Sequence, residues 1–251
     1  MEGGKRMKKV TVIIPFMSSG HLINLLDILL ENSVEPARIL LIDNSRGACF
    51  KDIAAYLKSP SYVSYFVNDS KLTSVNASWN LGFRIVLDVF KDTDIVSVLN
   101  DDLVITKDFI KGVIDAFEEL DDAGVVCPNT AVPLSIKSSG CVSIKESEVI
   151  TWLRERSNES GLKYQRMPRR QGWAYSIDSK LLKNIPAIPE ELKTFCGDDW
   201  IYYWTHKLGK NWYKMLRTVV FHYVSSTVRL FPEVRNALKK EKGVFQKLIN
   251  V

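Results

Sequence analysis

An acidic turn, Asn100-Asp101-Asp102, directly follows the apolar stretch 95–99. Carboxylates crowded at the end of a buried strand repel one another, and a bound cation would relieve that cost. Hard oxygen ligands with one imidazole suit Mn²⁺ or Mg²⁺ better than zinc or copper. We therefore expect Asp102 to bind a metal directly, with Asn100 or Asp101 acting directly or through water. The alternative is a solvated turn that caps the next helix.

Other polar residues stand where they would meet this turn, because ligands of open α/β sheets bind beyond the carboxyl ends of the strands. His222 follows the last apolar strand and is the natural neutral metal ligand, although a lone histidine is more often structural. Asp43 is a candidate to accept hydrogen bonds from a nucleoside, with a turn residue as the alternative. Asn76 and Asn80 open a later helix on the same side, and for Asn80 a structural capping role is equally open.

A second acidic pair, Asp198-Asp199, precedes an apolar helical segment. One of these carboxylates could act as a general base and deprotonate an attacking hydroxyl. Because adjacent residues cannot both point the same way, we assign Asp199 as the base and Asp198 to orienting the acceptor or the loop. The alternative is that the pair only caps the helix, since helix N-termini favour acidic residues.

A basic cluster lies in a less regular part of the sequence and consists of Lys163, Arg166, Arg169 and Arg170. Its charge suits closure over a diphosphate or contact with an anionic acceptor, and a solvated loop is the alternative. The net charge of +5 fits a protein that handles phosphate-bearing ligands. It would equally fit weak attraction to nucleic acid or to an anionic membrane surface.

The segments that must position these residues alternate between strand and helix patterns. Residues 10–16 are almost all apolar and rich in β-branched side chains, which is typical of a strand buried on both faces. Such alternation predicts a parallel sheet with helices on both faces. We expect further strands at 39–42, 62–67, 95–99, 124–127, 172–177 and 212–223, and helices at 22–30, 50–57, 74–90, 108–120, 179–184, 198–208 and from 232 onward. Within 129–170 we expect loops, a short hairpin and a helix near 149–156.

The bulk properties are those of one globular α/β domain. The chain has 251 residues, of which 46% are hydrophobic and 25% charged, and no apolar stretch reaches the roughly 18 to 20 residues that cross a bilayer. We therefore expect a cytoplasmic protein. The four cysteines form no CxxC pair, which argues against structural zinc and a disulfide framework. Without GxGxxG after the first strand, or GxxxxGK[ST], a dinucleotide-dependent oxidoreductase and a P-loop NTPase are disfavoured.

In order and spacing, these segments resemble the GT-A glycosyltransferases, most of all the family 2 type. The resemblance covers roughly residues 9–226, with Asn100-Asp101-Asp102 in the place of the DxD motif and Asp198-Asp199 in the place of the xED motif. It rests on the opening strand 10–15, the nucleoside-contacting segment 41–45, the helix 76–82, the metal strand 98–102, the acceptor-side strand 172–175, the base segment 197–199 and the late metal-ligand strand 221–223.

The resemblance implies a GT-A fold, a Rossmann-like mixed sheet flanked by helices. It divides the domain into a donor half at about 9–128 and an acceptor half at about 129–226, followed by a helical tail at 227–251. It implies inverting, Mn²⁺- or Mg²⁺-dependent transfer from a nucleotide sugar to an acceptor hydroxyl. The implied metal ligands are Asp102 and His222, the catalytic residues Asp199 and Asp198, and the donor-binding residues Pro15, Asp43, Asn76, Asn80, Asn100, Asp101, Arg169 and Arg170.

Three acceptor or activity hypotheses remain at this point. A glycan or surface polysaccharide is the first choice, because family 2 enzymes mostly build surface glycans. The basic charge and compact size also fit a phage-type enzyme that glycosylates a hydroxymethylated base in duplex DNA. The alternative of another class is a nucleotide- or sugar-binding protein that has lost catalysis.

Overall fold

The first half of the chain alternates strands and helices as the sequence predicts. The structure is a computed structural model that describes residues 6–34, 36–58, 62–68, 74–130, 151, 155, 161–168, 171–223 and 233–250. Its first elements are β1 (Val10–Phe16), α1 (Gly20–Leu30), β2 (Arg38–Asp43), α2 (Phe50–Lys58), β3 (Val63–Val67), α3 (Val75–Asp88) and β4 (Ile95–Leu99). β1 pairs in parallel with β2 and β4, and β2 with β3. The carboxyl ends of these four strands therefore lie at one edge of the sheet.

The second half adds antiparallel pairing. Its elements are β5 (Leu103–Val104), α4 (Phe109–Glu119), β6 (Ala123–Thr130), β7 (Tyr164–Arg166), β8 (Ala174–Asp178), α7 (Ser179–Leu182), α8 (Gly197–Lys207), β9 (Asn211–His222) and α10 (Glu233–Ile249). β8 runs antiparallel to β4 and β6, while β6 pairs in parallel with β9. The long β9 also pairs with the two short strands β5 and β7, both antiparallel.

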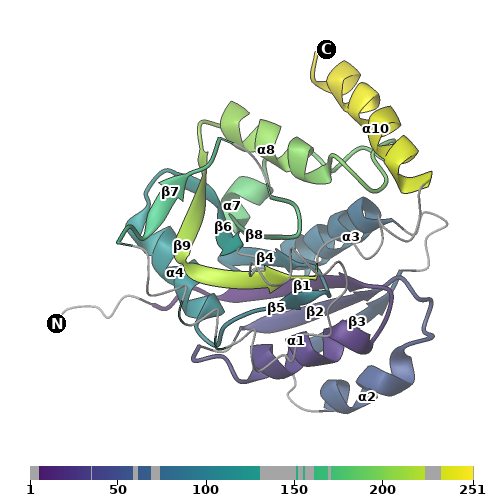
Figure 1. Cartoon of the computed structure of the whole chain (residues 1–251), viewed down its shortest axis with the longest axis vertical. Coiled ribbons are helices and arrows are strands. Elements are labelled where there is room, and N and C mark those ends of the chain that lie inside the picture. Colours follow the sequence, from purple (N-terminus) through teal and green to yellow (C-terminus); the bar gives the residue numbers. More distant parts are fainter. Residues whose placement is uncertain are drawn as a thin grey trace.

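Nine strands of the described residues form one mixed sheet in the order β3-β2-β1-β4-β8-β6-β9-β5, with β7 paired to β9. Figure 1 shows helices on both faces of this sheet, so the predicted mixed α/β architecture is confirmed. β5 and β7 are too short to appear as a periodic pattern, and the sequence analysis missed both. The loops, hairpin and helix expected at 129–170 fall mostly outside the described residues.

β1 shows why its sequence is an almost unbroken apolar run. Val12 and Ile14 are fully buried in the core on one side of the sheet, which α1 and α4 cover. Ile13 is fully buried in the other core, beside Trp79 and Phe83 of α3. Since alternate side chains of a strand point to opposite faces, a strand covered on both faces is apolar at almost every position. Thr11, the polar residue of β1, is buried and shares a hydrogen bond with Thr93.

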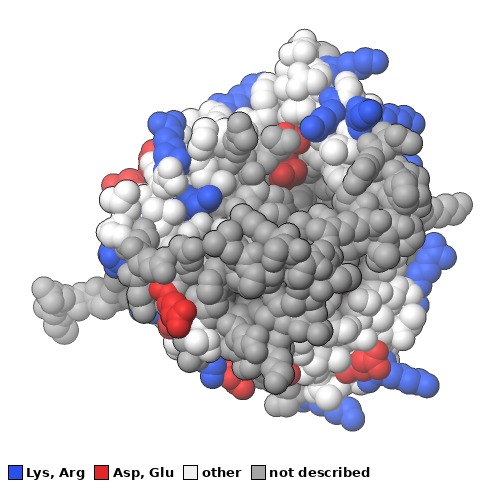
Figure 2. All heavy atoms as spheres, in the orientation of Figure 1, with Lys and Arg blue, Asp and Glu red and all other residues white. Residues whose placement is uncertain are grey.

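The C-terminal helix α10 is amphipathic, as its sequence predicts. Phe245 is 7% exposed and belongs to the core beneath α3 and α8, whereas Lys239, Lys240, Lys242 and Lys247 are exposed. Figure 2 shows basic side chains gathered at this end of the molecule. No helix among the described residues is both long and apolar enough to cross a membrane.

The contact between α3 and β1 depends on Gly82. A Cβ atom at this position would lie 2.7 Å from Cγ2 and 2.9 Å from Cδ1 of the fully buried Ile13. We predict that Gly82→Ala lowers the free energy of unfolding by about 1–3 kcal/mol, because overpacking in a closed core forces side chains from their preferred rotamers. Urea denaturation measures the change.

Gly243 in α10 provides the matched control, because no heavy atom lies within 4 Å of a Cβ built there. Gly243→Ala should therefore raise stability by about 0.5–1 kcal/mol through helix propensity alone. Equal effects of the two substitutions would contradict the packing described for Gly82.

Candidate metal and donor site

Backbone hydrogen bonds connect the acidic turn after β4 to two segments that are distant in the sequence. The N–H of Asn100 donates to the carbonyl of Trp173 at 2.9 Å, and the N–H of Tyr223 donates to the carbonyl of Asp102 at 3.1 Å. In the β5 and β9 pair, Leu103 stands opposite His222. Because this register places the residue before Leu103 beside the end of β9, two segments 120 positions apart in sequence meet here.

Asp102 and His222 form the centre of this site. The Oδ1 atom of Asp102 lies 3.2 Å from Nε2 of His222, and the two side chains are only 15% and 13% exposed. The imidazole stacks on the ring of Trp173, with ring centroids 5.1 Å apart and planes 21° apart. Asp102 Oδ1 is buried and has no hydrogen bond with good geometry in the described residues. An unsatisfied carboxylate oxygen beside an imidazole nitrogen is a donor set that fits a divalent cation.

Asp101 adds a second carboxylate to the same turn. Burial, followed by the negative charge of Asp102, raises the pKa of Asp101 to about 7. The N–H of Met17, after β1, and the nearby His222 favour the charged form of Asp101 but do not outweigh burial. Within the described part of the chain, no three His, Cys, Asp or Glu side chains form a cluster that could hold a metal alone. A cation on Asp102 and His222 would therefore need oxygens from water or from a ligand.

Asp43 lies at the end of β2 as predicted, and its carboxylate is used inside the protein. The residue is fully buried. Oδ1 accepts from the N–H of Ser45 at 2.5 Å, and Oδ2 accepts from the N–H of Gly47 at 2.9 Å and from the Tyr65 hydroxyl at 2.5 Å. Burial alone would raise the pKa of Asp43, but these hydrogen bonds together lower it. These contacts match the alternative interpretation, in which Asp43 orders a turn.

A polar cluster beside this turn was not predicted from the sequence. The Asn44 side-chain oxygen accepts from Asn68 Nδ2 at 2.9 Å and from the Ser78 hydroxyl at 2.8 Å. These residues come from the ends of β2 and β3 and from the first turn of α3. Each one alone is an ordinary turn or helix residue, so only the fold reveals the cluster. Pro15, also predicted for donor binding, is a buried β1 residue paired in register with Ile42.

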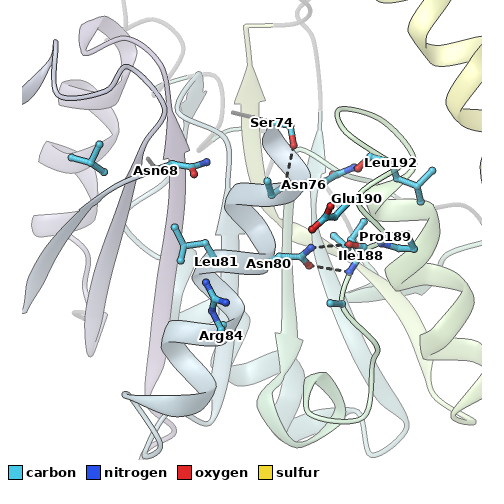
Figure 3. A pocket seen from close by; sticks show the side chains of 13 residues that line it. Asn68, Ser74, Asn76, Asn80, Leu81, Arg84, Ile188, Pro189, Glu190 and Leu192 are labelled. Atoms are coloured by element: carbon cyan, nitrogen blue, oxygen red, sulfur yellow. Dashed lines mark hydrogen bonds between the residues drawn. The ribbon is translucent and has the colours of Figure 1, made fainter. Parts of the chain in front are cut away.

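Asn76 and Asn80 hold the segment between α7 and α8. Asn80 exchanges two hydrogen bonds with the backbone of Ile188, at 2.8 and 2.9 Å (Figure 3). Asn76 is 2% exposed, and its Nδ2 atom donates to the carbonyls of Leu192 at 2.8 Å and Phe195 at 3.0 Å. Both amides therefore have structural contacts, and their predicted contact with a donor stays a prediction.

A cavity of about 540 Å³ lies between α3 and residues 187–192. Figure 3 shows Arg84 and Glu190 on its two sides, with the Asn80 contact to Ile188 bridging it. Both charged side chains are exposed. The cavity includes Asn68 and Ser74 at the edge where α3 begins, and contains neither Asp102 nor His222.

Asp198 and Asp199 occupy the first turn of α8 and face different neighbours. A Cβ at Gly172 would lie 2.9 Å from the Asp198 carboxyl carbon, so Asp198 packs directly on this glycine. Asp199 shares a hydrogen bond with the Cys196 thiol, and burial followed by the charge of Asp199 raises the pKa of that thiol to about 12. The two carboxylates therefore have different neighbours, and their assignment as general base and orienting residue stays a prediction.

The two acidic centres are close to each other. Gly172 contacts Asp198, and the next residue, Trp173, stacks on His222. Because consecutive Cα atoms are about 3.8 Å apart, Asp198 and His222 contact adjacent residues of the short segment before β8.

The basic cluster is not gathered at this edge as far as the structure describes it. Lys163 forms an ion pair with Glu119 at 2.9 Å, and Arg166 donates to Asn211. Arg166 stands opposite Tyr213, at the far end of β9 from His222. Arg169 and Arg170 lie outside the described residues, so their predicted contact with the diphosphate stays a prediction.

Several solved structures align with the fold of this chain. No protein-family model and no curated protein sequence matches the chain. Among solved structures, GalNAc-T7 with UDP, GalNAc and Mn²⁺ aligns with a TM-score of 0.64 at 14% identity, over 91% of this chain and 48% of that one. The mannosyltransferase PcManGT from Pyrobaculum calidifontis, in complex with GDP-Man and Mn²⁺, aligns with a TM-score of 0.62 at 15% identity, over 88% and 59%.

A third neighbour is S. aureus TarS 1-349 in complex with UDP, with a TM-score of 0.61 at 14% identity over 86% of this chain and 61% of that one. The chain thus spans about half to three-fifths of the length of these three proteins. At such low identity the alignments establish the fold alone. The mixed nine-stranded sheet flanked by helices is the fold of the GT-A glycosyltransferases.

Proposed function

We propose that the chain is a metal-dependent inverting glycosyltransferase that uses a nucleotide-sugar donor. The observation that carries the proposal is the approach of the Asp102 carboxylate to the His222 imidazole at the ligand-binding edge of a GT-A fold. The structures of GalNAc-T7 and PcManGT contain Mn²⁺ with UDP or GDP-Man. Their ligands support a nucleotide sugar and a divalent cation as the ligands of this edge.

Asp102 and His222 would hold the cation, with Asn100 and Asp101 assisting directly or through water. The Oδ1 atom of Asp102 is buried, and burial followed by the charge of Asp102 raises the pKa of Asp101 to about 7, so a cation at this turn would be favourable. When bound, Mn²⁺ or Mg²⁺ supplies positive charge that stabilises a departing diphosphate. Three roles follow for the protein itself: to hold the cation, to fix the donor and to activate the acceptor.

The nucleoside would lie at the ends of β1 and β2, near Pro15. Asp43 acts there by ordering the turn through Gly47, and the buried side chains of Asn68 and Ser78 hold the Asn44 side chain in place. The backbone groups of this turn would then meet the donor. Asn76 and Asn80 act by holding the loops on the other side of α3. This assignment keeps the predicted location of the donor and changes how these residues contribute.

Asp199 would be the general base, and Asp198 would orient the acceptor or the loop. In a single displacement, the acceptor oxygen forms a bond to the anomeric carbon as the bond from that carbon to the diphosphate oxygen breaks. The proton of the acceptor hydroxyl passes to Asp199, and the bonding electron pair leaves with the nucleoside diphosphate. Attack from the face opposite the leaving group inverts the anomeric carbon.

A glycan is the proposed acceptor. The DNA alternative depends on the basic cluster, and in the described residues Lys163 and Arg166 are paired to surface groups at the far end of β9. The two described members of the cluster therefore give the DNA alternative no specific support. The assay in the Asp199 prediction below distinguishes an enzyme from a binding protein without catalysis, because a binding protein would release no nucleoside diphosphate.

The burial of Asp101, next to the charge of Asp102, predicts a pH-dependent stability. Asp101 has an ordinary pKa near 3.8 when unfolded and about 7 when folded, so its ionisation destabilises the metal-free protein increasingly from about pH 4 to pH 7 and constantly above. Asp101→Asn should raise the melting temperature by several degrees at pH 8 and by less at pH 5, since about 1 kcal/mol shifts it by roughly 2–4 °C. Calorimetric melts without metal measure this.

The exposed Asp121 provides the control, because Asp121→Asn should leave the melting temperature unchanged at both pH values. Adding Mn²⁺ at pH 8 should stabilise the wild type more than Asp101→Asn. A gain from Asp101→Asn that is equal at pH 5 and pH 8 would contradict the charge crowding.

Asp102→Ala should abolish Mn²⁺-dependent binding of UDP or GDP, because it removes one of two protein ligands from the cation. Isothermal titration calorimetry with and without Mn²⁺ measures the loss, which we expect to exceed tenfold in affinity. Asp121→Ala is the matched control for loss of one carboxylate from the surface. Unchanged nucleotide binding by the Asp102 variant would overturn the metal assignment.

Asp199→Asn should leave Mn²⁺-dependent nucleotide binding intact and lower turnover by about 10²–10⁴-fold, because an amide cannot accept the proton. The assay measures release of nucleoside diphosphate from a panel of UDP- and GDP-sugars. A larger loss in Asp198→Asn than in Asp199→Asn would transfer the base assignment to Asp198. Release that needs neither carboxylate would exclude this mechanism.

A further inference from the structure

The loop that leads into α8 is held by a buried carboxylate from the C-terminal helix. Glu241 in α10 is 6% exposed. Its carboxylate accepts from the N–H of Phe195 at 2.8 Å and from the N–H of Thr194, with both oxygens at 3.2 Å. Figure 1 shows α10 beside the loop between α7 and α8. The helix that follows the sheet domain in sequence therefore contacts the segment just before Asp198 and Asp199.

The opposite side of the same loop is held by Asn76 of α3. Its side chain donates to the carbonyls of Leu192 and Phe195, and its backbone N–H donates to the carbonyl of Lys193 at 3.2 Å. Glu241 thus binds the N–H groups of the loop while Asn76 binds its carbonyls. A loop with both its donors and acceptors satisfied from two sides has few alternative conformations.

The backbone after the loop shows that it needs this support. Cys196 has φ of 58°, a left-handed conformation that costs a non-glycine residue about 1 kcal/mol or more. Gly197 follows, and a Cβ there would lie only 2.1 Å from Oδ1 of Asn76. Strained residues persist where surrounding contacts fix them. Here those contacts determine where α8 begins, and so where its two acids lie.

The cost of burying Glu241 indicates that this contact matters. Burying a carboxylate is costly unless its oxygens accept hydrogen bonds, and Glu241 is almost completely buried. Only the backbone N–H groups of the loop are described as its hydrogen-bond donors. Phe245, one helical turn further along α10, is buried in the core with Leu192 and Cys196. α10 is therefore packed onto the loop rather than loosely attached.

We infer that Glu241 is a positioning residue for the general base. It sets the 194–196 backbone, and through it the first turn of α8, so that Asp199 meets the acceptor hydroxyl. The inference rests on the proposed function for its catalytic consequence, but the contact itself does not. Glu241 lies on a different element from the metal pair and should affect turnover rather than donor binding.

The first test measures the contact without any assay of activity. Hydrogen-deuterium exchange on the full chain should show faster exchange of the Thr194 and Phe195 amides and of the first turn of α8 in Glu241→Gln, because glutamine offers one acceptor oxygen where glutamate offers two. Exchange in β1 and β4 should not change. Lys242→Gln, on the exposed side of the same helix, is the matched control. Unchanged exchange at 194–199 would overturn the contact.

The second test measures the consequence for turnover. Glu241→Gln should lower kcat for release of nucleoside diphosphate at least tenfold, since a displacement of about 1 Å can cost up to 10²-fold. Mn²⁺-dependent affinity for UDP or GDP should stay within twofold of wild type. A purely structural role predicts instead a reduced number of binding sites with unchanged kcat per site, which would overturn the positioning role.

The two tests separate this inference from the function on which it rests. If wild type releases no nucleoside diphosphate from any of the sugars while exchange at 194–199 responds as expected, the proposed function fails and the contact stands. If wild type is active and Glu241→Gln has unchanged kcat, the positioning role fails and the function stands. Lys242→Gln should match wild type in both measurements.

Discussion

The pairing of β5 with β9 is the interaction on which the candidate site depends. It joins only Leu103 to His222 and Val104 to Phe221, and backbone hydrogen bonds contribute about 1 kcal/mol each. So short a ladder survives because Leu103, Val104 and Phe221 are themselves buried. Apolar packing thus fixes the register, and the register places the acidic turn after β4 against the imidazole at the end of β9. A shift by one residue would turn His222 to the other face of the strand.

A second constraint acts on the acceptor side. α8 begins directly after a loop that α3 and α10 hold. The position of its two acids therefore depends on Asn76, more than 100 positions away in the sequence, and on Glu241, more than 40 positions away. Gly172 and Trp173 join this side to the candidate metal site, because Gly172 contacts Asp198 and Trp173 stacks on His222. The sheet therefore positions Asp102 and His222, and α8 positions the two acids. The two residues before β8 lie between these groups.

The sequence predicted what is local and missed what depends on distant partners. β1 and β4 are almost entirely apolar, with Thr11 and Ser97 as their polar residues, and a strand covered on both faces leaves that pattern in any sequence. β5 is two residues long and is a strand only because β9 lies beside it. Asp43 and Asn76 were expected to contact a ligand, but the sequence did not predict their hydrogen bonds inside the protein. Their partners Tyr65 and Leu192 are distant in sequence, and no local pattern connects them.

The central claim is that Asp102 and His222 bind a divalent cation together with a nucleoside diphosphate. Crystals grown with Mn²⁺ and UDP or GDP test it most directly, by anomalous scattering from manganese. The account predicts a peak about 2.0–2.3 Å from both an Asp102 carboxylate oxygen and Nε2 of His222, with diphosphate oxygens completing the coordination. A bound nucleotide with no manganese peak there, or with the peak elsewhere, would contradict it.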